Sequence, residues 1–181
     1  MNAGVAYAAR AGATIAVAVE DDRWRAVAAD VEDRCRIAAA AALDAVGAGD
    51  SGELSLLLTD DARVRALNAA YRGRDAPTNV LAFGGTIEAG AGREPPADAP
   101  RLLGDVVLAL ETVGREAQEQ GKSIADHVSH LIVHGTLHLL GFDHGPDRPA
   151  RRMEALEIAT LAGLGIADPY RPPAAHEQPT S

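Results

Sequence analysis

The sequence lacks several features that mark particular classes of protein. Cys35 is its single cysteine, so an intramolecular disulfide is excluded and a reducing compartment is indicated. The chain has no continuous apolar run of the about 20 residues that a helix needs to cross a bilayer. Its first residues also lack the basic start, apolar region and cleavage site of a signal peptide. These absences predict a cytoplasmic protein without a membrane partner.

Positive charge is scarce as well. The 181 residues contain 17 lysines and arginines against 26 aspartates and glutamates, a formal net charge of -9. This balance argues against non-specific coating of nucleic acid, although it leaves room for a local basic cleft. With 47% hydrophobic and 24% charged residues, the composition is that of a globular chain. We expect one domain over residues 1–168, followed by a Pro-rich, disordered tail over residues 169–181.

Apolar runs separated by turn residues predict an α+β fold. The expected architecture is a small mixed β-sheet of about four strands, with helices packed around a central helix that carries most of the histidines. Residues 84–100 are rich in glycine and proline and predict a surface loop. The predicted strands are 14–19, 53–59, 79–83 and 102–110, and the predicted helices are 24–46, 62–71, 111–120, one that starts at Ser123, and 151–164.

Three histidines near residue 140 have the spacing of a catalytic zinc site. His134 and His138 are four residues apart, so on a helix they project from one face and can bind one ion. Gly141 can take the left-handed conformation that ends a helix and turns the chain back, which would bring His144 to the same ion. Three neutral imidazoles leave the fourth position of a tetrahedral zinc for water, which then ionises near neutral pH. The motif therefore predicts a metallohydrolase.

Two features of the histidine helix bear on its chemistry. Gly135 stands where the zincin pattern H-E-x-x-H-x-x-G-x-x-H has its general-base glutamate, which argues against a peptidase and favours an anionic substrate such as a phosphodiester. His127 and His130 share a sector of about 80° with the other two helical histidines, so we expect this stripe to line a cleft. His130, His134 and His138 cannot all bind one ion, because the outer two are about 12 Å apart along the axis.

Three separate motifs resemble those of the YbeY family of bacterial rRNA maturation factors, which are single-domain, metal-dependent endoribonucleases. The first motif is L-N-A-A-Y-R-G-R-D-A-P-T-N-V-L-A-F at residues 67–83, and the second is L-G-D-V-V at residues 103–107. The third is the histidine motif, after which M-E-A-L-E at residues 153–157 matches the family's terminal helix. Ala82 and Gly84 depart from the family's usual serine and proline, which affects loop geometry but none of the predicted ligands.

The resemblance implies a single-strand-specific endoribonuclease that acts in 16S rRNA 3′-end maturation and in ribosome quality control. It implies one zinc ion on His134, His138 and His144, with ribosomal or ribosome-assembly proteins as partners. It also singles out Arg72 as the catalytic arginine, whose guanidinium can bind a phosphate by two hydrogen bonds. The alternative for Arg72 is a structural role, in which it either pairs with Asp75 or solvates the loop.

Several alternatives stay open at this point. The zincin spacing also suits a hydrolase of another substrate class, and a structural zinc suits a non-catalytic ribosome-assembly factor. Imidazole ligands accept nickel, copper or iron as well as zinc. For cleavage of RNA, either a water or the 2′-hydroxyl group can be the nucleophile.

Overall fold

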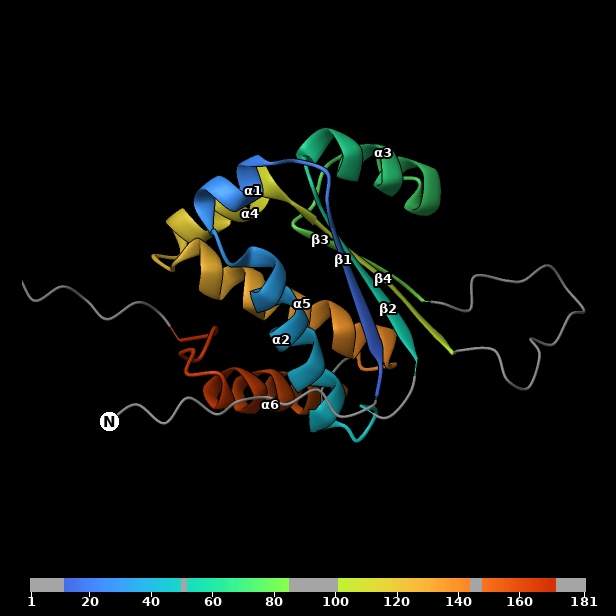
Figure 1. The fold of residues 1–181 in the computed structure, drawn as a ribbon, viewed down its shortest axis with the longest axis vertical. Helices are drawn as coiled ribbons and strands as arrows, with labels where there is room; N and C mark the ends of the chain where they lie inside the picture. Colours follow the sequence, from blue (N-terminus) through green and yellow to red (C-terminus); the bar gives the residue numbers. More distant parts are fainter. Residues whose placement is uncertain (1–11, 50–51, 85–100, 144–147, 172–181) are drawn as a thin grey trace, which may run out of the picture.

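The computed structural model describes residues 12–49, 52–84, 101–143 and 148–171 (Figure 1). All but the first residue of the loop predicted at 84–100 lies outside these described residues, as does His144. Within them the chain forms strands β1 (Thr14–Val19), β2 (Glu53–Thr59), β3 (Val80–Gly84) and β4 (Leu102–Ala109), and helices α1 (Arg23–Val27), α2 (Val31–Ala45), α3 (Asp61–Arg72), α4 (Leu110–Glu119), α5 (Ile124–Leu139) and α6 (Arg148–Gly163).

The four strands form one mixed sheet in the order β1-β2-β4-β3. Strands β1, β2 and β4 run parallel, whereas β3 pairs antiparallel with β4. The predicted α+β fold with a small mixed sheet is therefore confirmed. Because β3 is the last strand in this order, it presents one backbone edge for contacts outside the sheet.

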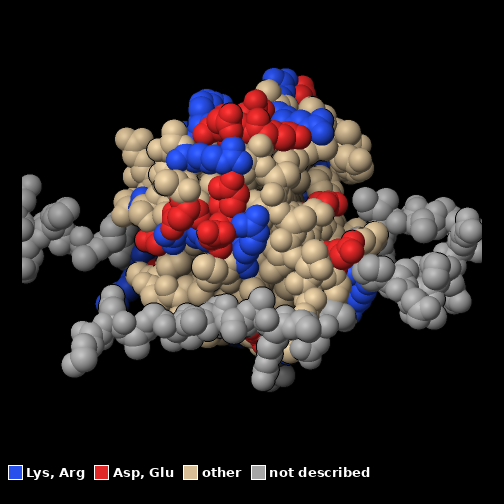
Figure 2. Space-filling view, in the orientation of Figure 1, with Lys and Arg blue, Asp and Glu red and all other residues tan. Residues whose placement is uncertain are grey.

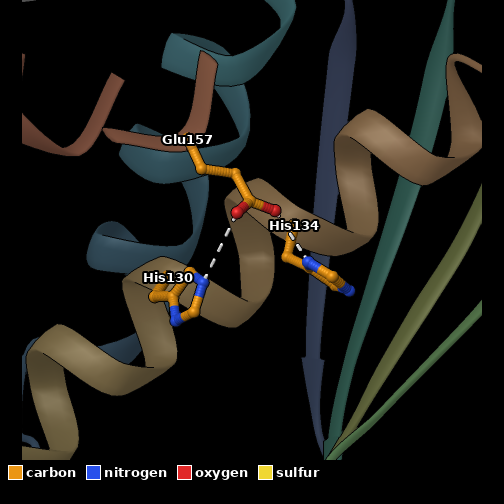
Figure 3. Close-up of side chains that lie close together, drawn as sticks. All are labelled: His130, His134 and Glu157. Carbon is orange, nitrogen blue, oxygen red and sulfur yellow. Dashed lines mark hydrogen bonds and ion pairs between the residues drawn. The ribbon is translucent and has the colours of Figure 1, made fainter. Parts of the chain in front are cut away.

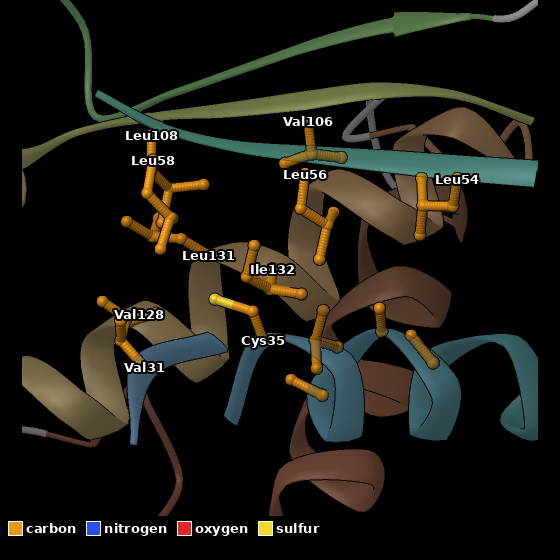
Figure 4. Packing of buried hydrophobic residues seen from close by; sticks show 14 of the residues in the cluster. Val31, Cys35, Leu54, Leu56, Leu58, Val106, Leu108, Val128, Leu131 and Ile132 are labelled. Atoms are coloured by element: carbon orange, nitrogen blue, oxygen red, sulfur yellow. The ribbon is translucent and has the colours of Figure 1, made fainter. Parts of the chain in front are cut away.

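Helices cover both faces of the sheet. Successive residues of a strand face opposite sides, and on β4 Val106 and Leu108 pack in the larger core, while Val107 and Ala109 pack in a smaller one. Helices α2 and α5 contribute to the larger core, and α3 contributes Val64 to the smaller one (Figures 1 and 4). The sheet is therefore the middle of three layers.

Helix α5 is the central helix, as predicted. It contacts α2, α4, α6, β3 and β4, and its side chains Val128, Ile132 and Leu137 are fully buried. At its start, the Ser123 hydroxyl accepts a hydrogen bond from the backbone N–H of Asp126 at 3.0 Å, which is the predicted cap. Neither α5 nor any other helix of the described residues has the length and apolar character to cross a membrane. A helix packed on so many sides holds its histidines in fixed positions.

The helix predicted over residues 24–46 is wrong in one respect, because it is two helices. Ala28 separates α1 from α2 and is extended, with φ −151°. The break allows the fully buried Trp24 to donate from Nε1 to the carbonyl oxygen of Thr59 at 2.9 Å. A buried indole N–H needs such a partner. No glycine or proline marks the break, so the sequence pattern did not reveal it.

At Gly135, α5 packs closely against the sheet. A Cβ added at this position would lie 2.8 Å from Cγ1 and 3.2 Å from Cγ2 of Val106, and 3.5 Å from Cγ2 of Val80. Real Cβ atoms essentially never approach another heavy atom as closely as the first of these distances. The absence of a glutamate here therefore has a steric cause, since any side chain would meet strands β3 and β4.

We predict that Gly135→Ala destabilises the protein, because the added methyl group overfills a packed site, which costs about 1–3 kcal/mol. Gly114→Ala on α4 is the matched control, since its Cβ would meet only Ile124 Cδ1 at 3.8 Å. Alanine in a helix interior is favoured over glycine by about 0.5–1 kcal/mol, so this control should be neutral or stabilising. Urea denaturation of both variants measures the difference. Equal stability of the two variants would contradict the close approach.

Candidate active site

A cleft of about 620 Å³ lies at the C-terminal half of α5. Strand β3, the last residue of α3 and the segment that follows α5 form the rest of its lining. The polar side chains that line it are Arg72, His134, His138 and Asp143. Two imidazoles and a guanidinium thus face one cavity, an arrangement that suits an anionic ligand.

His134 and His138 lie together in the cleft, as the spacing predicted. Their ring centroids are 4.6 Å apart and the rings are nearly perpendicular, at 79°. Gly141 has φ 86° and ends the helix in the predicted left-handed turn. The turn brings Asp143 to the cleft lining. The third predicted ligand, His144, is the next residue and lies outside the described residues, so its place at a metal stays a prediction.

Arg72 reaches the cleft from the other side of strand β3. It is the last residue of α3, which ends at the left-handed Gly73, and its Nη2 donates to the backbone carbonyl oxygen of Ala82 at 3.4 Å. Asp75 is not its partner, because Arg65 donates to both oxygens of that carboxylate at 2.6 and 2.8 Å. Of the two structural alternatives for Arg72, the pairing with Asp75 is therefore wrong. The residue lines the cleft.

A buried carboxylate on α6 holds the first of these histidines (Figure 3). Oε1 of Glu157 lies 2.7 Å from Nδ1 of His134, and the phenol of Tyr170 donates to Oε2. A carboxylate can only accept, so Nδ1 of His134 carries the proton of this contact, and Nε2 is the nitrogen left for a metal. Figure 3 shows that this second nitrogen points away from Glu157. Metal-binding histidines are commonly oriented by a carboxylate in this way.

Glu157 stays ionised although it is fully buried. Burial by itself would raise its pKa, but the imidazoles of His130 and His134 and the phenol of Tyr170 outweigh this effect and hold the pKa well below its usual range. The same contact and the burial of the phenol raise the pKa of Tyr170. The carboxylate is therefore a fixed negative charge directly behind His134.

His130, His134 and Glu157 form a second candidate metal site, since their ligand atoms lie within 4.8 Å of one another. Two observations favour the cleft instead. The 2.7 Å between His134 and Glu157 is a hydrogen-bond distance, whereas two ligands of one tetrahedral zinc are about 3.4 Å apart. In addition, the described cleft lining includes His134 but neither His130 nor Glu157.

The prediction that all four helical histidines line a cleft is wrong for two of them. His127 is 2% exposed, and its Nε2 lies 2.9 Å from Oε2 of Glu116, which also accepts from Asn79 at 2.9 Å. Burial lowers the pKa of His127 despite this carboxylate, so the ring is neutral. His130 lies between His127 and His134 and faces Glu157, at 3.8 Å. The four histidines follow one another along α5, but α4 and α6 pack over the part of the helix that carries His127 and His130.

Glu157 and Tyr170 are the site residues that the sequence did not identify. Glu157 belonged to a recognised motif, but only the packing of α6 on α5 gives it a role. Tyr170 lies in the tail that the sequence predicts to be disordered from residue 169. Pro169 is buried and Tyr170 is bonded to Glu157, so the packed chain extends past that boundary. The one sequence feature that could have indicated packing here is the aromatic Tyr170 directly after Pro169.

The sequence is similar to proteins of one family. The sequence profile of the family described as Endoribonuclease YbeY matches residues 17–165. The Endoribonuclease YbeY of Paramagnetospirillum magneticum is 53% identical over 157 residues, which cover 86% of this chain and 94% of that protein. The Endoribonuclease YbeY of Azorhizobium caulinodans is 49% identical over 162 residues, covering 88% of this chain and 98% of that protein. Tyr170 lies beyond the matched range.

We predict that Tyr170→Phe lowers the free energy of unfolding. It removes a donor to the buried Glu157 carboxylate, and because the tyrosine is 45% exposed, water offsets part of the loss, which leaves about 1 kcal/mol. Tyr71→Phe is the control, since that hydroxyl has no hydrogen bond within the described part of the chain and its residue is 64% exposed. Thermal unfolding of both variants tests this. A Tyr170→Phe protein as stable as the control would mean that the phenol does not support the carboxylate.

Proposed function

The chain belongs to the YbeY family of endoribonucleases, and from that membership we propose that it cleaves single-stranded RNA in the cleft at the end of α5. The observation that carries this proposal is that Arg72, His134 and His138 line one cavity. A phosphodiester is an anion, and a guanidinium beside two imidazoles suits its recognition. Arg72 is the only lysine or arginine in the described lining of the cleft.

We propose His134, His138 and His144 as the ligands of one zinc ion. The residues in place fit this role, because Glu157 fixes the tautomer of His134 and the adjacent ring of His138 lies 4.6 Å from it, centroid to centroid. A zinc bound there would supply a Lewis acid and a water of lowered pKa. The three ligands are neutral, so the ion would keep its full charge toward a phosphate.

Arg72 is proposed to bind the scissile phosphate. Its guanidinium is always protonated, so it serves as a donor and as a positive charge, not as a base. Its hydrogen bond to the Ala82 carbonyl fixes one end of the group at the edge of β3 and leaves its other N–H groups for a phosphate. Negative charge develops on the phosphate oxygens in the transition state, and a donor already in place stabilises that charge more than it stabilises the substrate.

The packing at Gly135 supports a phosphodiester over a peptide substrate. A peptidase of the zincin pattern needs a glutamate at that position to take up and pass on a proton. Here a side chain at position 135 would overlap Val106. The packing therefore excludes a glutamate at this position, where the sequence has glycine. A hydrolase of peptides is therefore the weaker alternative.

We further propose ribosomal RNA, near the 3′ end of 16S rRNA, as the substrate, with ribosomal or ribosome-assembly proteins as partners. The cytoplasm is the compartment that such a substrate implies. Figure 2 shows acidic and basic side chains interspersed on the face that it presents, with no broad basic area. This distribution, with the net charge of -9, suits recognition at a cleft better than general adhesion to RNA.

We predict that His138→Ala loses the bound metal and the part of thermal stability that zinc provides. His130→Ala should keep one zinc per chain, because His130 does not line the cleft. Metal analysis after dialysis, and melting temperatures with zinc and with a chelator, measure both effects. The opposite result, in which His130→Ala loses zinc and His138→Ala keeps it, would favour the site at His130, His134 and Glu157.

We predict that Arg72→Ala binds zinc normally but cleaves single-stranded RNA about 100-fold more slowly, or worse, because it lacks a donor to the transition state. Arg65→Ala is the matched control: it lies on the same helix, but its guanidinium is held by Asp75. Cleavage of labelled RNA by both variants and the wild type tests the assignment. Equal rates for the three proteins would remove Arg72 from the active site, and RNA binding without any turnover would favour an assembly factor.

A further inference from the structure

Aromatic side chains are scarce in this chain, yet three of them lie on the segments that form the cleft. The sequence contains one tryptophan, three tyrosines and two phenylalanines. Of those that the structure describes, Trp24 is buried in the core and Tyr170 is bonded to Glu157. Of the others, Phe142 lines the cleft, whereas Tyr71 and Phe83 contact each other.

Tyr71 and Phe83 form an aromatic pair at the edge of the sheet. Their ring centroids are 5.1 Å apart, and the rings are inclined at 56°. Phe83 lies between Ala82 and Gly84, which line the cleft, and packs toward the α3 side of β3. Tyr71 directly precedes Arg72 on α3. The pair therefore lies on the α3 side of the edge strand, next in sequence to Arg72, Ala82 and Gly84, which line the cleft.

The exposure of Tyr71 is not explained by core packing. The residue is 64% exposed, the largest value among the exposed large hydrophobic residues of the described chain. Phe83 supports the ring from one side, so an apolar, rigid surface is presented to solvent. An aromatic face of this kind, held beside a functional cleft, is typical of a ligand-binding surface.

The charges around Tyr71 favour a nucleic-acid strand as the ligand. Arg65 and Arg63, earlier on α3, are paired with Asp75 and Glu20. By contrast, Arg72 and the exposed Arg74 have no ion pair among the residues that the structure describes. Two arginines that lack such a pair in the described chain, within three residues of an exposed tyrosine, suit a phosphate backbone with an adjacent base.

We propose that Tyr71, supported by Phe83, stacks against an unpaired base of the RNA whose phosphate is bound in the cleft. This inference rests on the proposed function and names the part of the substrate that is recognised. A base in a duplex has both faces covered by its neighbours, whereas a base in a single strand can turn out and stack on a side chain. The pair of Tyr71 and Phe83, which we call the platform, thus gives a physical basis for a preference for single strands. Stacking of this kind does not depend on which base is present.

An abasic scan tests the platform. Fluorescence anisotropy would measure the affinity of the wild-type protein for single-stranded RNAs of one sequence, each with one abasic residue at a successive position. We expect one position at which base removal weakens wild-type binding by about tenfold. Tyr71→Leu should bind the intact RNA about tenfold more weakly and should be indifferent to base removal there. Tyr71→Phe keeps the aromatic face and should behave as the wild type.

Ile37→Ala is the control for loss of an exposed apolar side chain, since Ile37 is 45% exposed on α2, which contributes nothing to the described cleft lining. Tyr71→Leu binding as tightly as the wild type would overturn the platform. So would weaker binding with an unchanged abasic pattern, because that result indicates a structural role. RNA cleavage assayed on the same samples separates the base-stacking proposal from the proposed nuclease function. Cleavage by the wild type, with no position at which base removal weakens binding, rejects only the platform. A position-specific loss of binding without any cleavage rejects only the nuclease function.

Discussion

Helix α5 can lie against the sheet only because residue 135 has no side chain. The position of a Cβ there would be 2.8 Å from Val106, in the middle of the larger core. This contact places His134 and His138, on either side of the glycine along the helix, beside strand β3. Arg72 arrives at the same strand from α3 and is held by the carbonyl oxygen of Ala82. The cleft is therefore a product of how one helix meets one edge strand, and the chemistry of its lining depends on that fit.

The site also depends on one buried charge, the carboxylate of Glu157. Glu157 is fully buried, and a buried carboxylate is costly unless donors surround it. His134 and Tyr170 supply those donors from α5 and from the segment after α6. The same contacts hold α6 against α5 and orient the histidine ring, so a single network serves both stability and ligand geometry. A comparable network around Glu116 binds His127 and Asn79, which precedes β3, and so fixes the strand that carries the cleft lining.

Local patterns were sufficient to predict the framework, because strands and helices follow from the spacing of apolar residues. The four strands, the cap at Ser123 and the turn at Gly141 agree with the structure. The break at Ala28 escaped prediction because no glycine or proline marks it, and the contact it accompanies, from Trp24 to the carbonyl oxygen of Thr59, is distant in sequence. Likewise, the sector of the four histidines followed from helix geometry, but only tertiary packing shows that α4 and α6 cover His127 and His130. The role of Gly135 was anticipated from charge, whereas the structure adds a steric reason. Glu157 and Tyr170 act through contacts between distant segments, which one sequence does not reveal.

We propose that this protein binds its metal in the cleft and not between His130 and Glu157. Crystals grown with zinc, with diffraction recorded on both sides of the zinc absorption edge, locate the ion without reference to activity. We predict one strong anomalous peak in the cleft, within bonding distance of His134 and His138, with Glu157 still on Nδ1 of His134. A peak between His130 and Glu157, with none in the cleft, would contradict the account.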